Sequence, residues 1–205
     1  MATETKRDAD TRAGIEHGPI QADYLGMSLR LSELDVENQT YFRYCASHDF
    51  RLQRCCGCEQ LRYPPMPGCP WCASHESEWV KVDGRGEVHS YTEIYQAIQP
   101  GFADRLPYLV AIVELDVQKG QPTAQEGLRV VGNLVDGEGR LAAPAEIGEL
   151  GIGTRVRLVF TDVADGLSLP QWMIDEEANR SVSRPWRWDA SEAADLPEGS
   201  SAPVA

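Results

Sequence analysis

The chain has 205 residues, of which 42% are hydrophobic and 25% are charged, and its formal net charge is -13. This length allows one medium domain or two small ones, and the composition excludes a fibrous chain and a chain that is disordered throughout. The acidic balance opposes binding to a phosphate backbone, and no apolar run approaches the roughly 20 residues of a membrane-spanning helix. Because the polar start contains no apolar export segment, we expect a cytoplasmic protein.

The first 31 residues mix charged residues with glycine and alanine and show little periodicity. A segment without a repeating apolar face cannot bury enough surface to offset the entropy that ordering costs. We therefore predict a flexible arm over residues 1–31. His17 lies within this arm and has no predicted role.

A helix is predicted to follow the arm. Ser32 is a favourable N-cap residue, and Glu33 and Asp35 in the first turn would interact well with the helix dipole. Apolar residues fall on one face at helical spacing, at Leu34, Tyr41, Phe42 and Cys45. Cys45 is therefore interpreted as a small buried hydrophobic residue. The helix should lead directly into the next module.

The strongest motif consists of two Cys-x-x-Cys pairs, Cys55 with Cys58 and Cys69 with Cys72. Each pair can place two thiolates on one cation, and two pairs complete a tetrahedron. Because sulfur would fill all four positions, we predict a structural metal, zinc, with no open position for water or substrate. Disulfides are the alternative, but a chain without an export segment favours a bound metal.

The helix and the cysteines form a predicted zinc-ribbon module over residues 32–78. The ribbon is too short to build its own core, so its fold should depend on the metal. Cys56 lies inside the first knuckle and is interpreted as a bystander, and a role as a substitute ligand is the alternative. His75 follows Cys72 by three residues, but four thiolates already satisfy a tetrahedral ion.

Basic residues gather in and beside the ribbon, whereas acidic residues concentrate in the two ends of the chain. The basic set is Arg43, Arg51, Arg54, Arg62, Lys81 and Arg85. The simpler interpretation is an ordinary solvated surface. The alternative is a seat for an anionic group or for an acidic surface of a partner.

From Trp79 onward the pattern changes to β-strands. Five segments combine alternating or continuous apolar residues with β-forming composition, at residues 88–95, 108–115, 128–135, 154–163 and 167–174. A short helix is predicted near residues 144–150, between the third and the fourth strand. This order matches an OB-type Greek-key barrel, so we expect a mainly β fold with the barrel over residues 79–176.

Three local features belong to this barrel. Pro170 cannot donate to a sheet, so the last strand should lie at an edge or carry a bulge there. Residues 118–127 exceed what a tight hairpin needs and are predicted to be a mobile surface insertion. His89 lies on the more polar face of its strand and is interpreted as an ordinary strand residue, with a contact to a ligand or partner as the alternative.

An acidic tail over residues 177–205 follows the barrel and contains Trp186 and Trp188. Tryptophan side chains are costly to leave in water, and aromatic anchors dominate the energetics of interfaces. We therefore expect these two residues to dock either on the barrel or on a partner, while the rest of the tail is flexible.

These segments together resemble a known family, which joins a rubredoxin-like zinc ribbon to an OB fold and accompanies thiolases. The resemblance spans residues 35–176, and it rests on the stretches LQRCCGCEQLRYPPMPGCPWC, WVKVDGRGEVHSYTEIY, PGFADRLPYLVAIVEL, VVGNLV and FTDVADGLSLPQW. Their order and separation make it specific. The amino-terminal arm, the 118–127 insertion and the Trp-bearing tail depart from the family pattern, so the choice of partner stays open.

Members of that family are non-catalytic subunits that assemble with thiolase-fold enzymes or thiolase-like aldolases acting on acyl-CoA thioesters. The resemblance therefore implies a partner that performs thiolytic cleavage, retro-aldol cleavage or acetyl transfer. It also implies an α2β2 heterotetramer, because thiolase-fold chains dimerise and each dimer can carry one subunit at either end.

The resemblance also assigns expected roles to residues. Zinc would bind to the four cysteines already named, and the loop after the first barrel strand would help to contact the partner through Pro100, Gly101, Phe102 and Pro107. A coenzyme A thioester would be a ligand of the complex. Because guanidinium groups match phosphate geometry, the candidates for its phosphates are Arg51, Arg54 and Arg62.

We predict no catalytic residue in this chain. A thiolase needs an activated cysteine, a second cysteine and histidines on a larger fold, and no Ser/His/Asp spacing is recognisable around residues such as His48. Two alternative functions stay open. One is a free-standing acyl-CoA-binding scaffold between enzymes, and the other is a binder of single-stranded nucleic acid with Tyr91 and Tyr95 as stacking platforms, against which the acidic charge argues.

Overall fold

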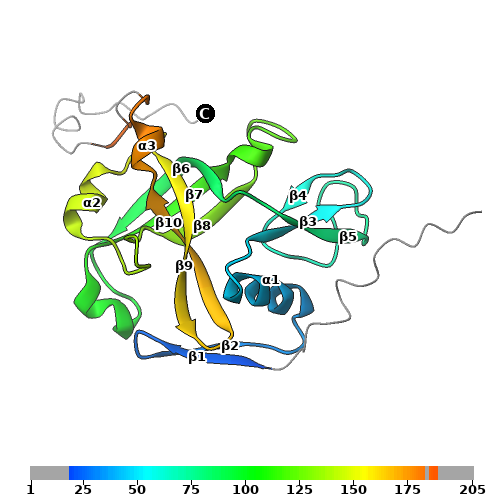
Figure 1. The fold of residues 1–205 in the computed structure, drawn as a ribbon, viewed down its shortest axis with the longest axis horizontal. Coiled ribbons are helices and arrows are strands. Elements are labelled where there is room, and N and C mark those ends of the chain that lie inside the picture. The colour runs from blue at the N-terminus through cyan, green and yellow to red at the C-terminus, as the bar shows by residue number, and fades with distance from the viewer. Residues whose placement is uncertain (1–18, 183–184, 189–205) are drawn as a thin grey trace, which may run out of the picture.

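A computed structural model of the chain describes residues 19–182 and 185–188 (Figure 1). The chain forms a five-stranded barrel and a smaller three-stranded ribbon, with the helix α1 (Val36–Ala46) beside the ribbon. His17, most of the predicted arm and most of the predicted tail lie outside the described residues. Within the described part, no helix has both the length and the apolar content needed to cross a membrane.

The barrel sheet has the strand order β10-β9-β6-β7-β8, and every pairing in it is antiparallel. The short helix α2 (Pro144–Glu149) lies between the third and fourth strands along the chain, as predicted. The strands are β6 (Arg85–Ile94), β7 (Tyr108–Leu115), β8 (Arg129–Asn133), β9 (Arg155–Ala164) and β10 (Leu167–Ile174). This arrangement confirms the mainly β fold with an OB-type barrel.

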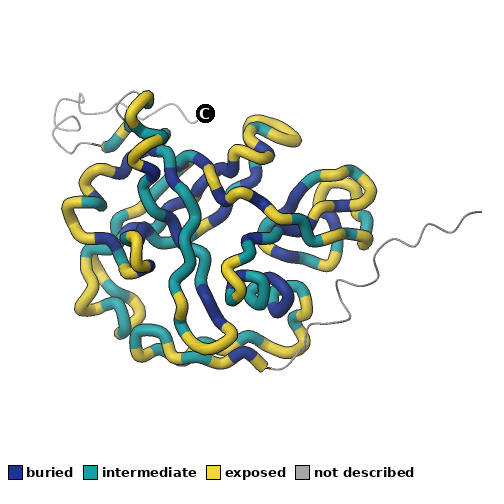
Figure 2. Tube along the Cα trace, in the orientation of Figure 1, coloured by how far each residue is buried: buried dark blue, intermediate teal, exposed yellow. Residues whose placement is uncertain are grey.

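Trp172 closes the barrel between its first and last strands in the sheet order. Its backbone forms a parallel bridge with Leu134, and its carbonyl accepts a hydrogen bond from the Val135 amide at 2.8 Å. The indole is fully buried in the main core. Because the bridge brings β10 next to the end of β8, the sheet closes on itself, and buried stretches lie along its strands (Figure 2).

The strand β7 is fully buried on one face, whereas its other face is covered only in part. Leu109, Ala111, Val113 and Leu115 are fully buried and point into the barrel. Ile112, on the other face, is exposed and lies opposite Val131 of β8, which is also exposed. Ile112 and Val131 are apolar although exposed because β-branched side chains favour strands even on a partly solvated face.

The ribbon sheet has the order β4-β3-β5, formed by β3 (Arg51–Cys55), β4 (Leu61–Arg62) and β5 (Ser77–Lys81). The helix α1 packs its Tyr41 and Cys45 side chains into the core that includes Leu52 of β3. The helix therefore packs against the ribbon that follows it in the chain. Burial of such apolar side chains contributes roughly 1.5–3 kcal/mol each.

The predicted start of α1 is wrong by three residues. Asp35, and not Ser32, is the N-cap, because its carboxylate accepts a hydrogen bond from the Asn38 amide at 3.2 Å. The Ser32 hydroxyl instead accepts from the Leu34 amide at 3.2 Å, in a local turn before the helix. Leu34 therefore lies outside the helix and is 87% exposed.

Residues 20–31 form a β-hairpin, which corrects the prediction of a flexible arm over this stretch. The strands β1 (Ile20–Tyr24) and β2 (Met27–Leu31) are antiparallel and pass close to β9 (Figure 1). The turn consists of Leu25 (φ 55°) and Gly26 (φ 74°), and the Gly26 amide donates to the Asp23 carboxylate at 3.0 Å. Leucine is rare in the left-handed region, so the turn has no recognisable sequence signal.

The last strand and the predicted insertion also have defined positions. The strand β10 is outermost in the sheet order, as expected from Pro170, and its bulge lies earlier, between Leu167 and Ser168. The insertion is exposed over residues 121–126. At its start, however, Gln118 ends a short 3-10 helix (Asp116–Gln118) and is buried.

Candidate functional site

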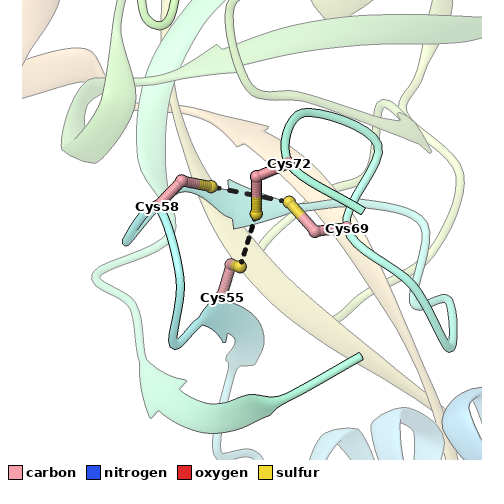
Figure 3. A group of neighbouring side chains, drawn as sticks. All are labelled: Cys55, Cys58, Cys69 and Cys72. Atoms are coloured by element: carbon pink, nitrogen blue, oxygen red, sulfur yellow. Dashed lines mark hydrogen bonds between the residues drawn. The ribbon is translucent and has the colours of Figure 1, made fainter. Parts of the chain in front are cut away.

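Four cysteine side chains of the ribbon point toward one centre (Figure 3). The Sγ atoms of Cys55, Cys58, Cys69 and Cys72 all lie within 4.8 Å of one another. The Cys55 and Cys72 sulfurs are 3.5 Å apart, and the Cys58 and Cys69 sulfurs are also 3.5 Å apart. Four thiolates at Zn–S distances of about 2.3 Å would be roughly 3.8 Å apart, so this set fits a single tetrahedral ion.

The two cysteine turns have matching backbone geometry. In the first, the Glu59 amide donates to the Cys55 carbonyl at 3.0 Å, and in the second, the Ala73 amide donates to the Cys69 carbonyl at 2.9 Å. Glu59 (φ 63°) and Ala73 (φ 60°) both adopt the left-handed conformation that such a turn requires after its second cysteine. The two turns therefore present their sulfurs in equivalent ways.

Backbone amides prepare the first turn for a cation. The amides of Cys58 and Gly57 donate toward the Cys55 sulfur and lower the pKa of this thiol to about 6. The Gly57 amide lies 3.3 Å from that sulfur. Because the thiolate is the form that binds metal, this shift favours the ligand state near neutral pH.

The other two cysteines lie apart from the cluster. Cys45 is fully buried on α1, as predicted, and desolvation raises the pKa of its thiol to about 12. Cys56 is exposed within the first turn, and its amide donates to the Glu76 carbonyl at 3.0 Å. Among the described residues, the metal-ligand cluster contains these four sulfurs and no histidine, so His75 is not part of it.

The three arginines proposed for an anionic ligand have different surroundings. Arg51 pairs with Asp49 at 2.6 Å, and its guanidinium lies 5.0 Å from the centre of the Tyr44 ring. Arg54 donates twice to one oxygen of Glu78, at 2.6 and 2.9 Å. Arg62 is buried, and its Nε donates to the Gln53 side chain at 3.0 Å. Two of the three guanidinium groups are therefore already paired with carboxylates.

The loop predicted to contact a partner is held by the β1–β2 hairpin. It contains a 3-10 helix (Pro100–Arg105), in which Phe102 stacks on Tyr108 with ring centres 4.6 Å apart. Phe102 also packs edge-on against Tyr24, at 6.3 Å. The backbone of Gly101 touches that of Leu25 so closely that a Cβ on Gly101 would clash.

Other apolar side chains of the same connection remain in solvent. Tyr95 and Ile98 are strongly exposed, Ile98 to 92%, and Leu106 is partly exposed. The segment between β6 and β7 therefore has a packed half that faces the hairpin and an apolar half that faces solvent. Sequence reasoning selected residues of the packed half, including Gly101 and Phe102, named Tyr95 only as a stacking platform for nucleic acid, and missed Ile98.

The tail docks on the barrel through Arg187, which sequence reasoning missed. The Trp186 backbone forms an antiparallel bridge with Ile152, and Arg187 donates to the Ile147 and Leu150 carbonyls at 2.8 and 2.7 Å. Arg187 also pairs with Glu93. Trp186 and Trp188 remain 56% and 61% exposed, because side chains alternate along an extended segment.

A histidine, an aspartate and a serine meet at the tip of the β9–β10 hairpin. Nε2 of His48 lies 2.7 Å from Oδ1 of Asp162, and the Ser168 hydroxyl donates to the same oxygen at 2.6 Å. The imidazole also stacks on Phe160. Because the serine donates to the aspartate and not to the histidine, this group lacks the nucleophile–base contact that a catalytic triad requires.

His89 is an exposed residue 3.9 Å from the Glu114 carboxylate.

Comparison with known proteins agrees with the two modules. The family model for the C-terminal OB-fold domain of ChsH2 matches residues 79–161, which include β6, β7 and β8. A solved structure of an Ltp2-ChsH2(DUF35) aldolase has the same fold, with a TM-score of 0.53 and 33% identity. The match covers 67% of this chain and 94% of that chain.

Three curated relatives extend this result. The chain is 35% identical over 137 residues to a probable enoyl-CoA hydratase alpha subunit of Thermomonospora curvata, covering 67% of this chain but only 37% of that protein. It is 32% identical over 113 residues to a DUF35 domain-containing scaffold protein of Methanothermobacter thermautotrophicus, covering 55% of this chain and 71% of the relative. It is 30% identical over 116 residues to the benzoylsuccinyl-CoA thiolase subunit BbsA of Thauera aromatica, covering 57% and 68%.

The extent of these matches differs between relatives. The chain spans little more than a third of the hydratase alpha subunit, but more than two thirds of the DUF35 scaffold protein. The alignment with the scaffold protein and the fold shared with the DUF35 chain of the aldolase agree with the four-cysteine ribbon and the barrel. The chain therefore belongs to the DUF35 family.

Proposed function

We propose that this chain is a non-catalytic subunit that assembles with a thiolase-fold enzyme acting on acyl-CoA thioesters. The fold shared with the Ltp2-ChsH2(DUF35) aldolase is the observation that carries this proposal. The similarity to BbsA, a benzoylsuccinyl-CoA thiolase subunit, supports it independently. The partner would perform thiolytic cleavage, retro-aldol cleavage or acetyl transfer, and the assembly would contain two copies of each chain.

The chemistry of the described residues supports a non-catalytic role. The four clustered cysteines would fill the tetrahedral coordination sphere of a bound ion and leave no position for a substrate. The His48, Asp162 and Ser168 group has no nucleophile–base contact. The chain would then contribute a surface, and the reacting groups would belong to its partner.

The metal in the proposed assembly is zinc, held by Cys55, Cys58, Cys69 and Cys72. Zinc accepts four thiolates without a preferred geometry of its own, which suits a closed structural site. It would hold the two cysteine turns together, because most of their other residues are exposed and pack against little else. None of the six cysteines, all within the described residues, forms a disulfide, which supports a reducing compartment such as the cytoplasm.

Two surfaces are suited to the partner. One is the connection between β6 and β7, where Tyr95 and Ile98 are exposed beside the loop of Pro100, Gly101, Phe102 and Pro107. The other is the docked tail, whose Trp186 and Trp188 side chains face outward. Exposed aromatic and aliphatic residues of this kind are typical anchors of protein interfaces.

A CoA thioester is the proposed ligand of the complex. Arg51, Arg54 and Arg62 remain its candidate phosphate contacts, and the salt bridges of Arg51 and Arg54 make these two less available. Each of the three arginines can be changed to alanine in turn. If none of these substitutions alters the acyl-CoA affinity of the assembled complex, the proposed phosphate contact is wrong.

Co-expression with a thiolase-like chain tests the assembly. The two chains should co-elute as a heterotetramer, and the catalytic chain should lose stability or activity when this subunit is removed. If the chains elute separately and the thiolase-like chain is fully active alone, the proposed function is wrong.

A second function is favoured by the relative named as a scaffold protein. In this case the chain binds acyl-CoA by itself or bridges two enzymes, without belonging to either active site. Calorimetry with acyl-CoA on the isolated chain separates the two functions, because a subunit that only completes its partner's site should show no binding alone.

A further inference from the structure

The junction between the ribbon and the barrel contains a cavity of about 210 Å³. One wall comes from the ribbon, including Arg62 and Trp71, and the other from the β7–β8 connection and the start of β8, including Gln118, Glu126 and Arg129. Because a bound water needs only about 10–15 Å³ of such space, the cavity is large enough for a small polyatomic ligand.

Arg62 is the unusual residue in this wall. It is 3% exposed, and its Nε donates to the Gln53 side chain at 3.0 Å. Its Nη1 and Nη2 atoms are buried and make no hydrogen bond to any described residue. Because Gln53 is neutral, this contact does not compensate the positive charge of the Arg62 guanidinium. A buried guanidinium without a counterion is strongly unfavourable.

The rest of the wall does not supply the missing charge. Glu126 accepts a hydrogen bond from the Thr123 hydroxyl at 2.9 Å, and within the described residues it makes no hydrogen bond to the Arg62 Nη atoms. Arg129 adds a second positive charge, although its Nη1 and Nη2 atoms donate to the carbonyls of Gln125 and Ala124. The cavity therefore carries more positive than negative charge.

We propose that this cavity binds a small oxyanion, a phosphate or a carboxylate group, through Arg62. The planar guanidinium can donate two parallel hydrogen bonds to either group, and such charge-assisted pairs are among the stronger polar contacts in proteins. The partly exposed Trp71 also lines the cavity. Since the walls belong to two modules, a bound oxyanion also stabilises the ribbon against the barrel.

This site is a property of the isolated chain and does not depend on the proposed thiolase partner. The test is therefore made on the full metal-loaded chain alone, with inorganic phosphate and acetate as probes and chloride to hold the ionic strength constant. Thermal unfolding and titration of tryptophan fluorescence are followed. The wild type is expected to gain several degrees in Tm at saturating probe, because the ligand binds the folded state.

Arg62→Gln should lower the affinity for the probe at least tenfold, whereas Arg140→Gln, which removes the same charge at an exposed ion pair, should change it less than twofold. If Arg62→Gln does not fold, Arg129→Gln should weaken binding, and Trp71→Phe should reduce the fluorescence response. A response to phosphate alone or to acetate alone supports the site and identifies the group. An absent response, or one equal in Arg62→Gln and wild type, overturns it.

Discussion

The side-chain amide of Gln118 forms hydrogen bonds with both the backbone amide and the backbone carbonyl of Leu61. Its Oε1 accepts from the Leu61 amide at 2.7 Å, and its Nε2 donates to the Leu61 carbonyl at 3.1 Å. Gln118 belongs to the barrel and Leu61 to the ribbon strand β4, so this pair of buried bonds imitates one step of a β-sheet between the modules.

Gln118→Ala should loosen the ribbon from the barrel. The substitution leaves the Leu61 amide and carbonyl buried without partners, and each such group costs about 1–3 kcal/mol. For the two groups together we expect a loss of unfolding free energy of roughly 2–6 kcal/mol, and faster amide exchange at Leu61. Gln121→Ala, at an exposed position of the same loop, is the control and should leave both unchanged.

Cys69→Ser should abolish stoichiometric metal binding and unfold the ribbon. Structural zinc contributes an apparent binding free energy of about 10–16 kcal/mol in small peptides, and three thiolates retain only part of it. Elemental analysis and amide exchange of β3 and β5 measure the effect, and a strong chelator should reproduce it. Cys56→Ser should keep one metal per chain, and equal metal content in the two variants would contradict the assigned ligands.

Arg187→Met should release the tail from the barrel. Its guanidinium holds two carbonyls at the end of α2 and the Glu93 carboxylate, contacts that together contribute about 1–2 kcal/mol in this partly exposed setting. The Ile152 amide, which donates to Trp186 at 2.7 Å, should then exchange at least tenfold faster. Arg180→Met, an exposed neighbour in the chain, provides the matched control.

Ile98→Glu should weaken assembly with the thiolase-fold partner about tenfold or more, because a charge in the centre of an interface must be desolvated. The Tm of the isolated Ile98→Glu variant should equal that of the wild type, since the Ile98 side chain is 92% exposed. Leu34→Glu is a matched control, with 87% exposure before α1. Titration of the two purified chains measures the affinity of each variant for the partner. An equal loss of affinity in Ile98→Glu and Leu34→Glu would contradict the assignment of this surface.

The ion pair of Asp116 and Arg155 should make stability depend on pH in the acid range. Hydrogen bonding to Arg155 lowers the pKa of the Asp116 carboxyl below its usual value of about 3.9. The stabilisation is therefore fully present above the unfolded pKa and is lost as the pH falls through the lower folded pKa.

Asp116→Asn should accordingly cost less than about 1 kcal/mol near pH 6, because the carboxylate is partly exposed, and the cost should vanish toward pH 2. Denaturant titrations at several pH values measure the difference between the two proteins. Asp165→Asn, in the β9–β10 turn, is the reference substitution. A difference that stays constant down to pH 2 would show that the carboxylate charge is not responsible.

The sequence by itself determined the features that depend on neighbouring residues. The spacing of Cys55 and Cys58, and of Cys69 and Cys72, predicted the cluster because each pair needs only one short turn to present two sulfurs. The order of five apolar segments with one short helix predicted the barrel, because strand alternation and helix position are local patterns.

Only the tertiary structure decided which groups meet across long stretches of chain. It placed Arg187 against α2 and left Trp186 and Trp188 exposed, it ordered residues 20–31 beside β9, and it buried Arg62 without a counterion. Each outcome depends on contacts between residues far apart in the sequence. Local propensity carries no information about such contacts, because burial and pairing arise from packing of the whole chain.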